Sequence, residues 1–170
     1  MNCSWWASHP VARPPSRSIS ALTKPSALTP QWVSMSNISP SNGHTLRFWD
    51  LNGTLDAFWR HYVKDTAGIV YVVDSSEEDF MEDAKVALWR LFENAELEDA
   101  VLLVFTNKQD RLDAISVTEV KDRLELETRA KGLRWHIQGS SVVSGDGLVE
   151  GMAWMTNQLK GRTWRHALGM

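Results

Sequence analysis

Cysteine is almost absent from this chain: Cys3 is the only one among 170 residues. A single thiol cannot close an intramolecular disulfide, so a disulfide-stabilised secreted scaffold is excluded and a reducing compartment is expected. Long apolar runs are lacking as well. The longest, such as AGIVYVV and AVLLVF, are far shorter than the roughly 20 residues that a transmembrane helix needs. The sequence therefore predicts a soluble, cytoplasmic protein without a transmembrane segment.

A strong excess of one charge is also lacking, since the formal net charge is −3. This small value favours neither nucleic acid nor an anionic membrane surface as a partner. With 43% hydrophobic residues and a mass of 19.2 kDa, the chain is long enough for one globular domain with a sizeable core.

Acidic residues are missing from the first 49 positions, and all six prolines fall within the first 40. A Ser/Pro-rich segment of this kind buries too little apolar surface to offset its chain entropy, so we predict that residues 1–30 are disordered. An organelle transit peptide has a similar composition and is the alternative. Trp5 and Trp6 have no explanation in either interpretation.

Strand patterns recur from residue 45 onward. WVSMSNI, just upstream, is the expected hairpin partner of the first strand, joined to it through the turn-prone SPSNG. Strands are predicted at residues 45–50, 68–74, 100–105 and 134–138.

Amphipathic stretches between and after these strands predict three helices, at residues 75–97 with Ser76 as the cap, at residues 116–126 with a capping box, and from near Asp146 onward. Asp74 is expected to cap the first helix rather than act in catalysis. The residues expected on the core faces of the first and last helices are Phe80, Ala84, Ala87, Leu88, Leu91, Phe92, Leu148, Met152, Met155 and Leu159.

Strands that alternate with helices imply right-handed crossovers, hence an α/β fold with a mostly parallel sheet covered on both faces. We expect the domain to span residues 31–162, followed by a short tail at residues 163–170.

The tetrapeptide NKQD, residues 107–110, follows a predicted strand at the sheet edge where α/β folds bind ligands. Asp110 is placed to accept hydrogen bonds from the N1–H and the exocyclic amine of guanine. Adenine lacks this donor pair, and a site of this kind rejects the wrong ligand by roughly 10⁴ to 10⁵. Lys108 would lay its methylene stem along the base, and Asn107 would tie neighbouring loops together. The alternative is a polar turn that merely closes the strand.

Two further loops follow predicted strands. WDLNG brings Asp50, whose carboxylate can hold Mg²⁺ through water, and Gly53, whose amide can approach a phosphate closely. QGSSVVSGDG, residues 138–147, offers a backbone amide to the guanine O6. We therefore expect three loops at three strand ends to converge on one ligand.

On these residues the chain resembles the ADP-ribosylation factor (ARF) family of small GTPases, from about residue 45 to residue 162. The resemblance rests on WDLNG, FWRHY, GIVYVVDS, DAVLLVFTNKQD and IQGSSVVSGDGLVEGMAWMTNQL, in this order and spacing. It implies a three-layer, Ras-like fold of the P-loop NTPase type and binding of GTP or GDP with Mg²⁺. It also implies a switch function in vesicle-mediated protein transport at the Golgi or other endomembranes, with exchange factors, activating proteins and effectors of the ARF type as partners.

The resemblance implies roles for individual residues. Asp50 would hold Mg²⁺ through water, and Trp49 and Tyr62 would lie on the effector-binding surface. The residues implied in binding the guanine nucleotide are Gly53, Asn107, Lys108, Asp110, Ser141 and Val142.

Three features depart from the family. No G-x-x-x-x-G-K-[ST] loop, which cradles phosphates, occurs in the 170 residues, so the N-terminal strand and helix beside it are expected to be missing or replaced. Asn52, Gly53 and Thr54 stand where the family has Gly-Gly-Gln, and threonine cannot orient water as glutamine does. Asn2 stands where an N-myristoylation signal needs glycine.

These departures leave enzymatic activity undecided and three hypotheses open. The first is an ARF-like GTP-binding protein in which GTP binding and hydrolysis are impaired. The second is a pseudo-GTPase that acts as a protein-interaction module through Trp49 and Tyr62. The third is a truncated product without function.

Overall fold

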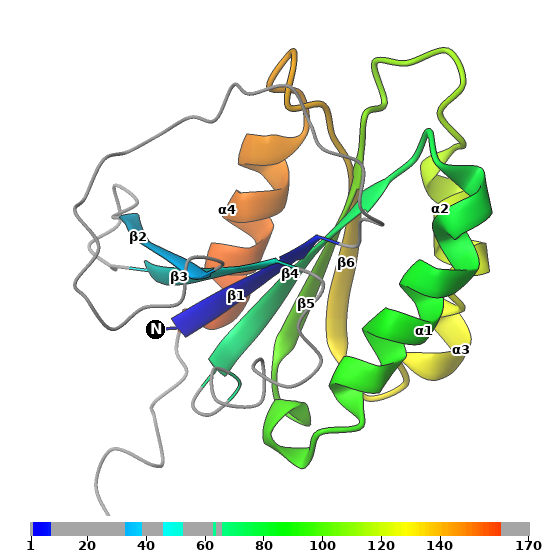
Figure 1. Ribbon diagram of the computed structural model, residues 1–170. Helices are drawn as coiled ribbons and strands as arrows, with labels where there is room; N and C mark the ends of the chain where they lie inside the picture. Colours follow the sequence, from blue (N-terminus) through cyan, green and yellow to red (C-terminus); the bar gives the residue numbers. More distant parts are fainter. Residues whose placement is uncertain (1, 8–32, 39–45, 53–62, 64–65, 161–170) are drawn as a thin grey trace, which may run out of the picture.

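The computed structural model describes residues 2–7, 33–38, 46–52, 63 and 66–160, which form a six-stranded sheet with helices on both faces (Figure 1). The strand order is β2-β3-β1-β4-β5-β6. Of the described strands, β2 alone runs antiparallel to its neighbour, which confirms the predicted hairpin and the mostly parallel α/β sheet. The strands are β1 (Asn2–Ala7), β2 (Val33–Ile38), β3 (Leu46–Asn52), β4 (Thr66–Asp74), β5 (Val101–Asn107) and β6 (Arg134–Gly139).

Helices cover the two faces of the sheet unequally. Among the described helices, α1, α2 and α3 lie on one face and α4 lies on the other (Figure 1). Within the described residues, no helix is long and apolar enough to cross a membrane. The helices are α1 (Met81–Phe92), α2 (Val117–Arg123), α3 (Leu126–Arg129) and α4 (Leu148–Leu159), with 3₁₀ turns at Glu78–Phe80 and Ala95–Leu97.

Strands β4 and β5 are buried along almost their whole length because helices cover both of their faces. Successive side chains point to opposite faces. Ile69 of β4 belongs to a hydrophobic cluster with Leu88 of α1, whereas its neighbour Val70 belongs to a second cluster with Met155 of α4. The continuous apolar runs in the sequence therefore supply two cores, one on each side of the sheet.

Strand β1 lies in the segment that we predicted to be disordered. It pairs in parallel with β3 and β4, with Trp5 opposite Asp50 on one side and Val70 on the other. Both neighbouring strands offer backbone N–H and C=O groups that need partners, and NCSWWA contains no proline that would break this pairing. The average composition of residues 1–30 is rich in Ser and Pro and therefore does not indicate the strand at Asn2–Ala7. The expected N-terminal strand is thus replaced, and residues 8–32 lie outside the described part of the chain.

Two helices differ from their predicted bounds. Ser76 does not cap α1, because its amide and hydroxyl both donate to Asp74 Oδ1, at 3.0 and 2.7 Å. Asp74 therefore caps this turn, not α1, which begins only after the 3₁₀ turn at Glu78–Phe80. Phe80 precedes the helix and is 37% exposed. The second predicted helix is divided into α2 and α3 at Glu125, whose φ is 56°.

The start of α2 and the core face of α4 agree with the sequence. Ser116 Oγ accepts a hydrogen bond from the amide of Glu119 at 3.2 Å, which is half of the predicted capping box. Met155 and Leu159 of α4 are fully buried, and Met152 packs against the same cluster.

Helix α4 approaches β5 most closely at Gly151. A Cβ atom at this position would lie 2.5 Å from Cε1 and 2.6 Å from Cζ of Phe105, whose ring is buried in the core. The absence of a side chain therefore sets the distance between helix and sheet.

Gly151→Val should lower the free energy of unfolding by about 1–3 kcal/mol, since the new side chain must displace the helix or the Phe105 ring. Ala153, exposed on the same helix, supplies the control. Ala153→Val adds the same β-branched side chain without the clash and should cost less than about 1 kcal/mol. Urea denaturation of both variants measures the difference. Equal losses would contradict the close approach.

Candidate functional site

Loops meet at the carboxyl edge of the sheet, after β4, β5 and β6. Asp74 and Asn107, which end β4 and β5, are directly paired in register. The amide of Ser75 donates to the Asn107 carbonyl at 3.0 Å, and the amide of Gln109 donates to the Ser140 carbonyl at 3.1 Å. The loops after β5 and β6 therefore lie against each other, and their convergence on a ligand stays a prediction.

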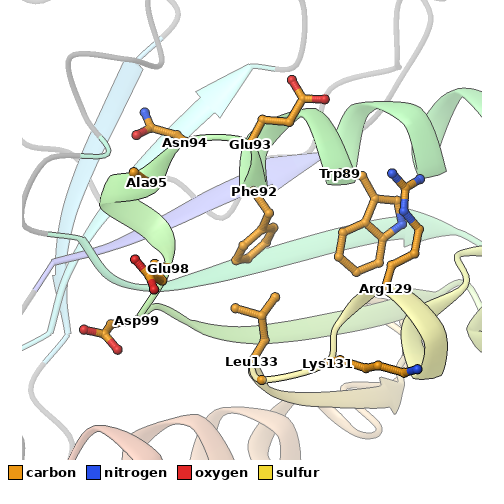
Figure 2. Close-up of a pocket in the computed structure, with 11 residues that line it drawn as sticks. Trp89, Phe92, Glu93, Asn94, Ala95, Glu98, Asp99, Arg129, Lys131 and Leu133 are labelled. Carbon is orange, nitrogen blue, oxygen red and sulfur yellow. The ribbon is translucent and has the colours of Figure 1, made fainter.

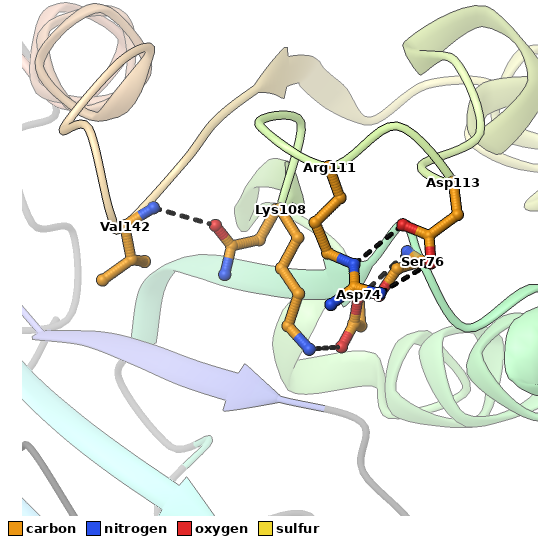
Figure 3. Close-up of polar contacts among 7 residues, drawn as sticks. Asp74, Ser76, Lys108, Arg111, Asp113 and Val142 are labelled. Carbon is orange, nitrogen blue, oxygen red and sulfur yellow. Dashed lines mark hydrogen bonds and ion pairs between the residues drawn. The ribbon is translucent and has the colours of Figure 1, made fainter.

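Asn107 ties these two loops together, as predicted. Its side-chain oxygen Oδ1 accepts a hydrogen bond from the amide of Val142 at 3.2 Å (Figure 3). The Val142 side chain is 60% exposed. An exposed apolar side chain held beside polar ones is the kind of surface that a flat, partly apolar ring can contact.

Ser141 makes a second connection between the loops. Its hydroxyl donates to Asp110 Oδ1 and accepts hydrogen bonds from the amides of Val143 and Ser144, both at 3.2 Å. Ser141 is only 2% exposed, whereas Asp110 lies at the surface. The buried hydroxyl therefore fixes the orientation of an exposed carboxylate.

The loop after β6 owes its shape to Gly147, whose φ is 74°. A Cβ atom there would lie 1.8 Å from the carbonyl oxygen of Gly139, so only glycine fits. Inside the loop, the amide of Ser141 donates to the Asp146 carbonyl at 3.0 Å, and the amide of Gly145 donates to the Ser141 carbonyl at 2.8 Å. Residues 141–146 therefore form a turn that is closed by backbone hydrogen bonds.

Lys108 reaches from the end of β5 to the end of β4. Its φ is 67°, a left-handed conformation that is uncommon for a residue with a side chain. Its ammonium forms an ion pair with Oδ2 of Asp74 (Figure 3). The Asp74 side chain is 6% exposed and that of Lys108 is 39% exposed, so a buried carboxylate holds a half-exposed cation.

Burial alone would raise the pKa of the Asp74 carboxyl, but hydrogen bonds from Lys108 and from the hydroxyl and amide of Ser76 outweigh it. The pKa of Asp74 is therefore lowered, and the group is charged at neutral pH. Sequence reasoning missed this contact, since it assigned Asp74 to a helix cap. The available signal was that Asp74 and NKQD end two successive predicted strands, which places them side by side in a parallel sheet.

The other predicted site residues are only partly described. Asp50 and Trp49 lie in β3, whose carboxyl end points to the same edge as that of β5, and Asp50 is paired with Ser34 of β2. Nothing beyond the backbone of Asp50 and Trp49 is described. Gly53 and Tyr62 lie outside the described residues.

A groove of about 610 Å³ lies elsewhere, between the end of α1 and the segment that joins α3 to β6 (Figure 2). Phe92 and Leu133 point into it, and the guanidinium of Arg129 lies 5.2 Å from the ring centroid of Trp89. The Trp89 indole donates to the Leu124 carbonyl at 2.8 Å. None of the predicted site residues lines this groove, so it belongs to a different surface.

The described loops after β5 and β6 fit the edge of a guanine base. Ser141 binds Oδ1 of Asp110 and leaves Oδ2 without a hydrogen bond from any described residue. An ionised carboxylate only accepts hydrogen bonds, which matches the two neighbouring donors of guanine. In the described part of the chain, which does not include the side chain of Asp50, no group of three or more His, Cys, Asp or Glu side chains could hold a metal ion.

The predicted amide donor for guanine O6 is already engaged. The amides of Ser141, Val142, Val143 and Ser144 all donate within the protein. A bond to O6 from one of these amides would have to be shared with its present acceptor.

The sheet order, its antiparallel edge strand β2 and the polar loops at its carboxyl edge define a Ras-like α/β domain, the fold of small GTPases. The family model of the ADP-ribosylation factor family matches residues 24–159. The chain belongs to this family. The resemblance noted in the sequence starts at about residue 45, whereas the family model matches from residue 24. The match therefore includes the whole β2-β3 hairpin.

Ser141→Ala should lower the free energy of unfolding by about 1–2 kcal/mol, because two loops lose a shared hydroxyl. The amide protons of Val143 and Ser144 should also exchange faster with solvent. Ser144→Ala is the matched control, since that hydroxyl bonds to Asp146 within the exposed turn, and it should cost less than about 0.5 kcal/mol. Hydrogen exchange measured by NMR tests this prediction. Unchanged exchange at Val143 and Ser144 in Ser141→Ala would show that the Ser141 hydroxyl does not connect the two loops.

Proposed function

We propose that this chain is a guanine-nucleotide-binding protein of the ARF type that reads the base of GTP or GDP through the loops after β5 and β6. The observation that carries the proposal is the pair of contacts, Asn107 with Val142 and Ser141 with Asp110, that fix these loops to each other. The role of a switch in vesicle-mediated protein transport rests on the family, as does a location in the cytoplasm or at Golgi and other endomembrane surfaces.

The base is recognised by shape and by donor pattern. Asp110 accepts the N1–H and the exocyclic amine of guanine, and the methylene stem of Lys108 lies along the ring. Val142 lines the base from the β6 loop, supported by the contact of its amide with Asn107. The hydrogen bonds between the loops support this arrangement, because they hold Asp110 and Val142 in fixed positions.

Recognition of the phosphates is the weak part of the site. The 170 residues contain no phosphate-cradling loop of the G-x-x-x-x-G-K-[ST] type. Asp50 and Gly53 remain the residues proposed to face Mg²⁺ and the terminal phosphate, where the ion would neutralise phosphate charge. Charge-assisted hydrogen bonds contribute only about 1.5–3 kcal/mol each, so base contacts alone hold GTP much more weakly than a complete site does.

A second candidate function is a pseudo-GTPase that serves as a protein-interaction module. Thr54 stands where the family has the glutamine that orients water, and this observation favours a chain that binds without hydrolysing. Trp49 and Tyr62 match two aromatic residues of the family's effector surface and are the proposed contacts to effectors. Turnover of GTP would exclude this second candidate, whereas the absence of turnover is expected for both.

GDP should bind more tightly than ADP, and Asp110→Asn should reduce this preference by at least about tenfold, because an amide presents donors where the carboxylate presents acceptors. Asp113→Asn, which removes an exposed carboxylate from the same loop, is the matched control and should leave the preference unchanged. NMR titrations with guanine, adenine and xanthine nucleotides measure the affinity for each, and the method is suited to weak binding. Equal affinities for GDP and ADP would show that NKQD is a polar turn.

The 170-residue chain should release no phosphate from GTP above background, with or without an activating protein. Phosphoryl transfer needs a lysine and backbone amides on the phosphates and a residue that orients water, and Thr54 cannot replace the glutamine. Single-turnover assays with labelled GTP measure this, with Asp110→Ala as a control for contaminating GTPases. Turnover that Asp110→Ala abolishes would establish an active enzyme and exclude the pseudo-GTPase.

A further inference from the structure

The carboxylate of Asp74 is held on both oxygens. Oδ2 pairs with the Lys108 ammonium, and Oδ1 accepts the amide and the hydroxyl of Ser76 at 3.0 and 2.7 Å (Figure 3). The other cation drawn nearby, Arg111, is engaged with Asp113 through two bonds of 2.8 and 2.6 Å. Within the described part of the chain, Lys108 is therefore a cation that the buried carboxylate holds.

This contact determines the course of the Lys108 side chain. Lys108 follows β5 and Asp74 ends β4, so the stem crosses from one strand end to the next (Figure 3). A lysine whose ammonium is free samples many rotamers, and fixing them when a ligand binds costs about tenfold in affinity. Asp74 already holds the Lys108 ammonium. The loss of side-chain entropy therefore accompanies folding and does not weaken ligand binding.

We propose that Asp74 is a positioning residue for guanine recognition: it holds the Lys108 ammonium so that the methylene stem forms a fixed wall against which the base packs. The inference rests on the proposed function, which supplies the base as the ligand. Asp74 acts through Lys108 and touches no atom of the nucleotide.

Acetylation of amines, followed by mass spectrometry, tests whether Asp74 holds Lys108. In the wild-type chain Lys108 should react at least about threefold more slowly than the exposed Lys131, and this protection should disappear in urea. Asp74→Asn should raise the reactivity of Lys108 to that of Lys131, whereas Asp113→Asn should not change it. Equal reactivity of Lys108 and Lys131 in the folded wild-type chain would overturn the inference without the need for any variant.

A double-mutant cycle with GDP tests whether the contact serves the base. Asp74→Asn should weaken GDP binding about tenfold in the otherwise wild-type chain and have no effect in a Lys108→Met background. Asp74→Glu, which keeps the charge, should restore part of the affinity. An equal loss in both backgrounds would show that Asp74 acts by another route and would overturn the positioning role.

The two measurements separate this inference from the function on which it rests. A wild-type chain that binds no GDP refutes the proposed function and, with it, the positioning role, even if acetylation shows that Lys108 is held. A chain that binds GDP and prefers it to ADP, but whose affinity is the same in Asp74→Asn, refutes the positioning role alone.

Discussion

The parallel pairing of β4 with β5 is the constraint on which the rest of the structure depends. Side-by-side strands from Gly68 and Val101 to Asp74 and Asn107 leave two apolar faces that need cover, and α1 and α4 supply it. The same pairing brings both polar strand ends to one edge. Burial of the core and the meeting of the polar strand ends are thus consequences of one register, because a shift of one residue would exchange the two cores and separate Asp74 from the end of β5.

The elements that could be predicted from the sequence are those whose own residues show the expected hydrophobic pattern. Strands β4 and β5 are continuous apolar runs, and α4 has one apolar stripe, so neighbouring segments do not alter the prediction. Strand β1 has no such signal, because its pairing depends on β3 and β4, which lie far along the chain. The start of α1 was missed because the Asp74 side chain competes for the amide of Ser76, which a capping pattern does not reveal.

The candidate site divides in the same way. Asn107 and Asp110 belong to one short motif, and their loop contacts follow from its position after a strand. The ion pair between Lys108 and Asp74 depends on the register of two strands, so it appears only in three dimensions. The roles of Asp50, Gly53 and Tyr62 concern the phosphates, the metal and effectors, and they stay predictions. What the described residues provide is a pair of loops whose polar groups hydrogen-bond to one another.

The position of β1 has a consequence for how this domain tolerates change. The segment between β3 and β4 is held there by backbone pairing, which does not require particular side chains. An N-terminal segment can therefore take its place in the sheet whether or not it carries a phosphate-binding motif. The hexapeptide NCSWWA, which contains no phosphate-cradling motif, occupies this place and completes the sheet. The order of the strands in this domain thus depends on backbone pairing and not on a phosphate-binding motif.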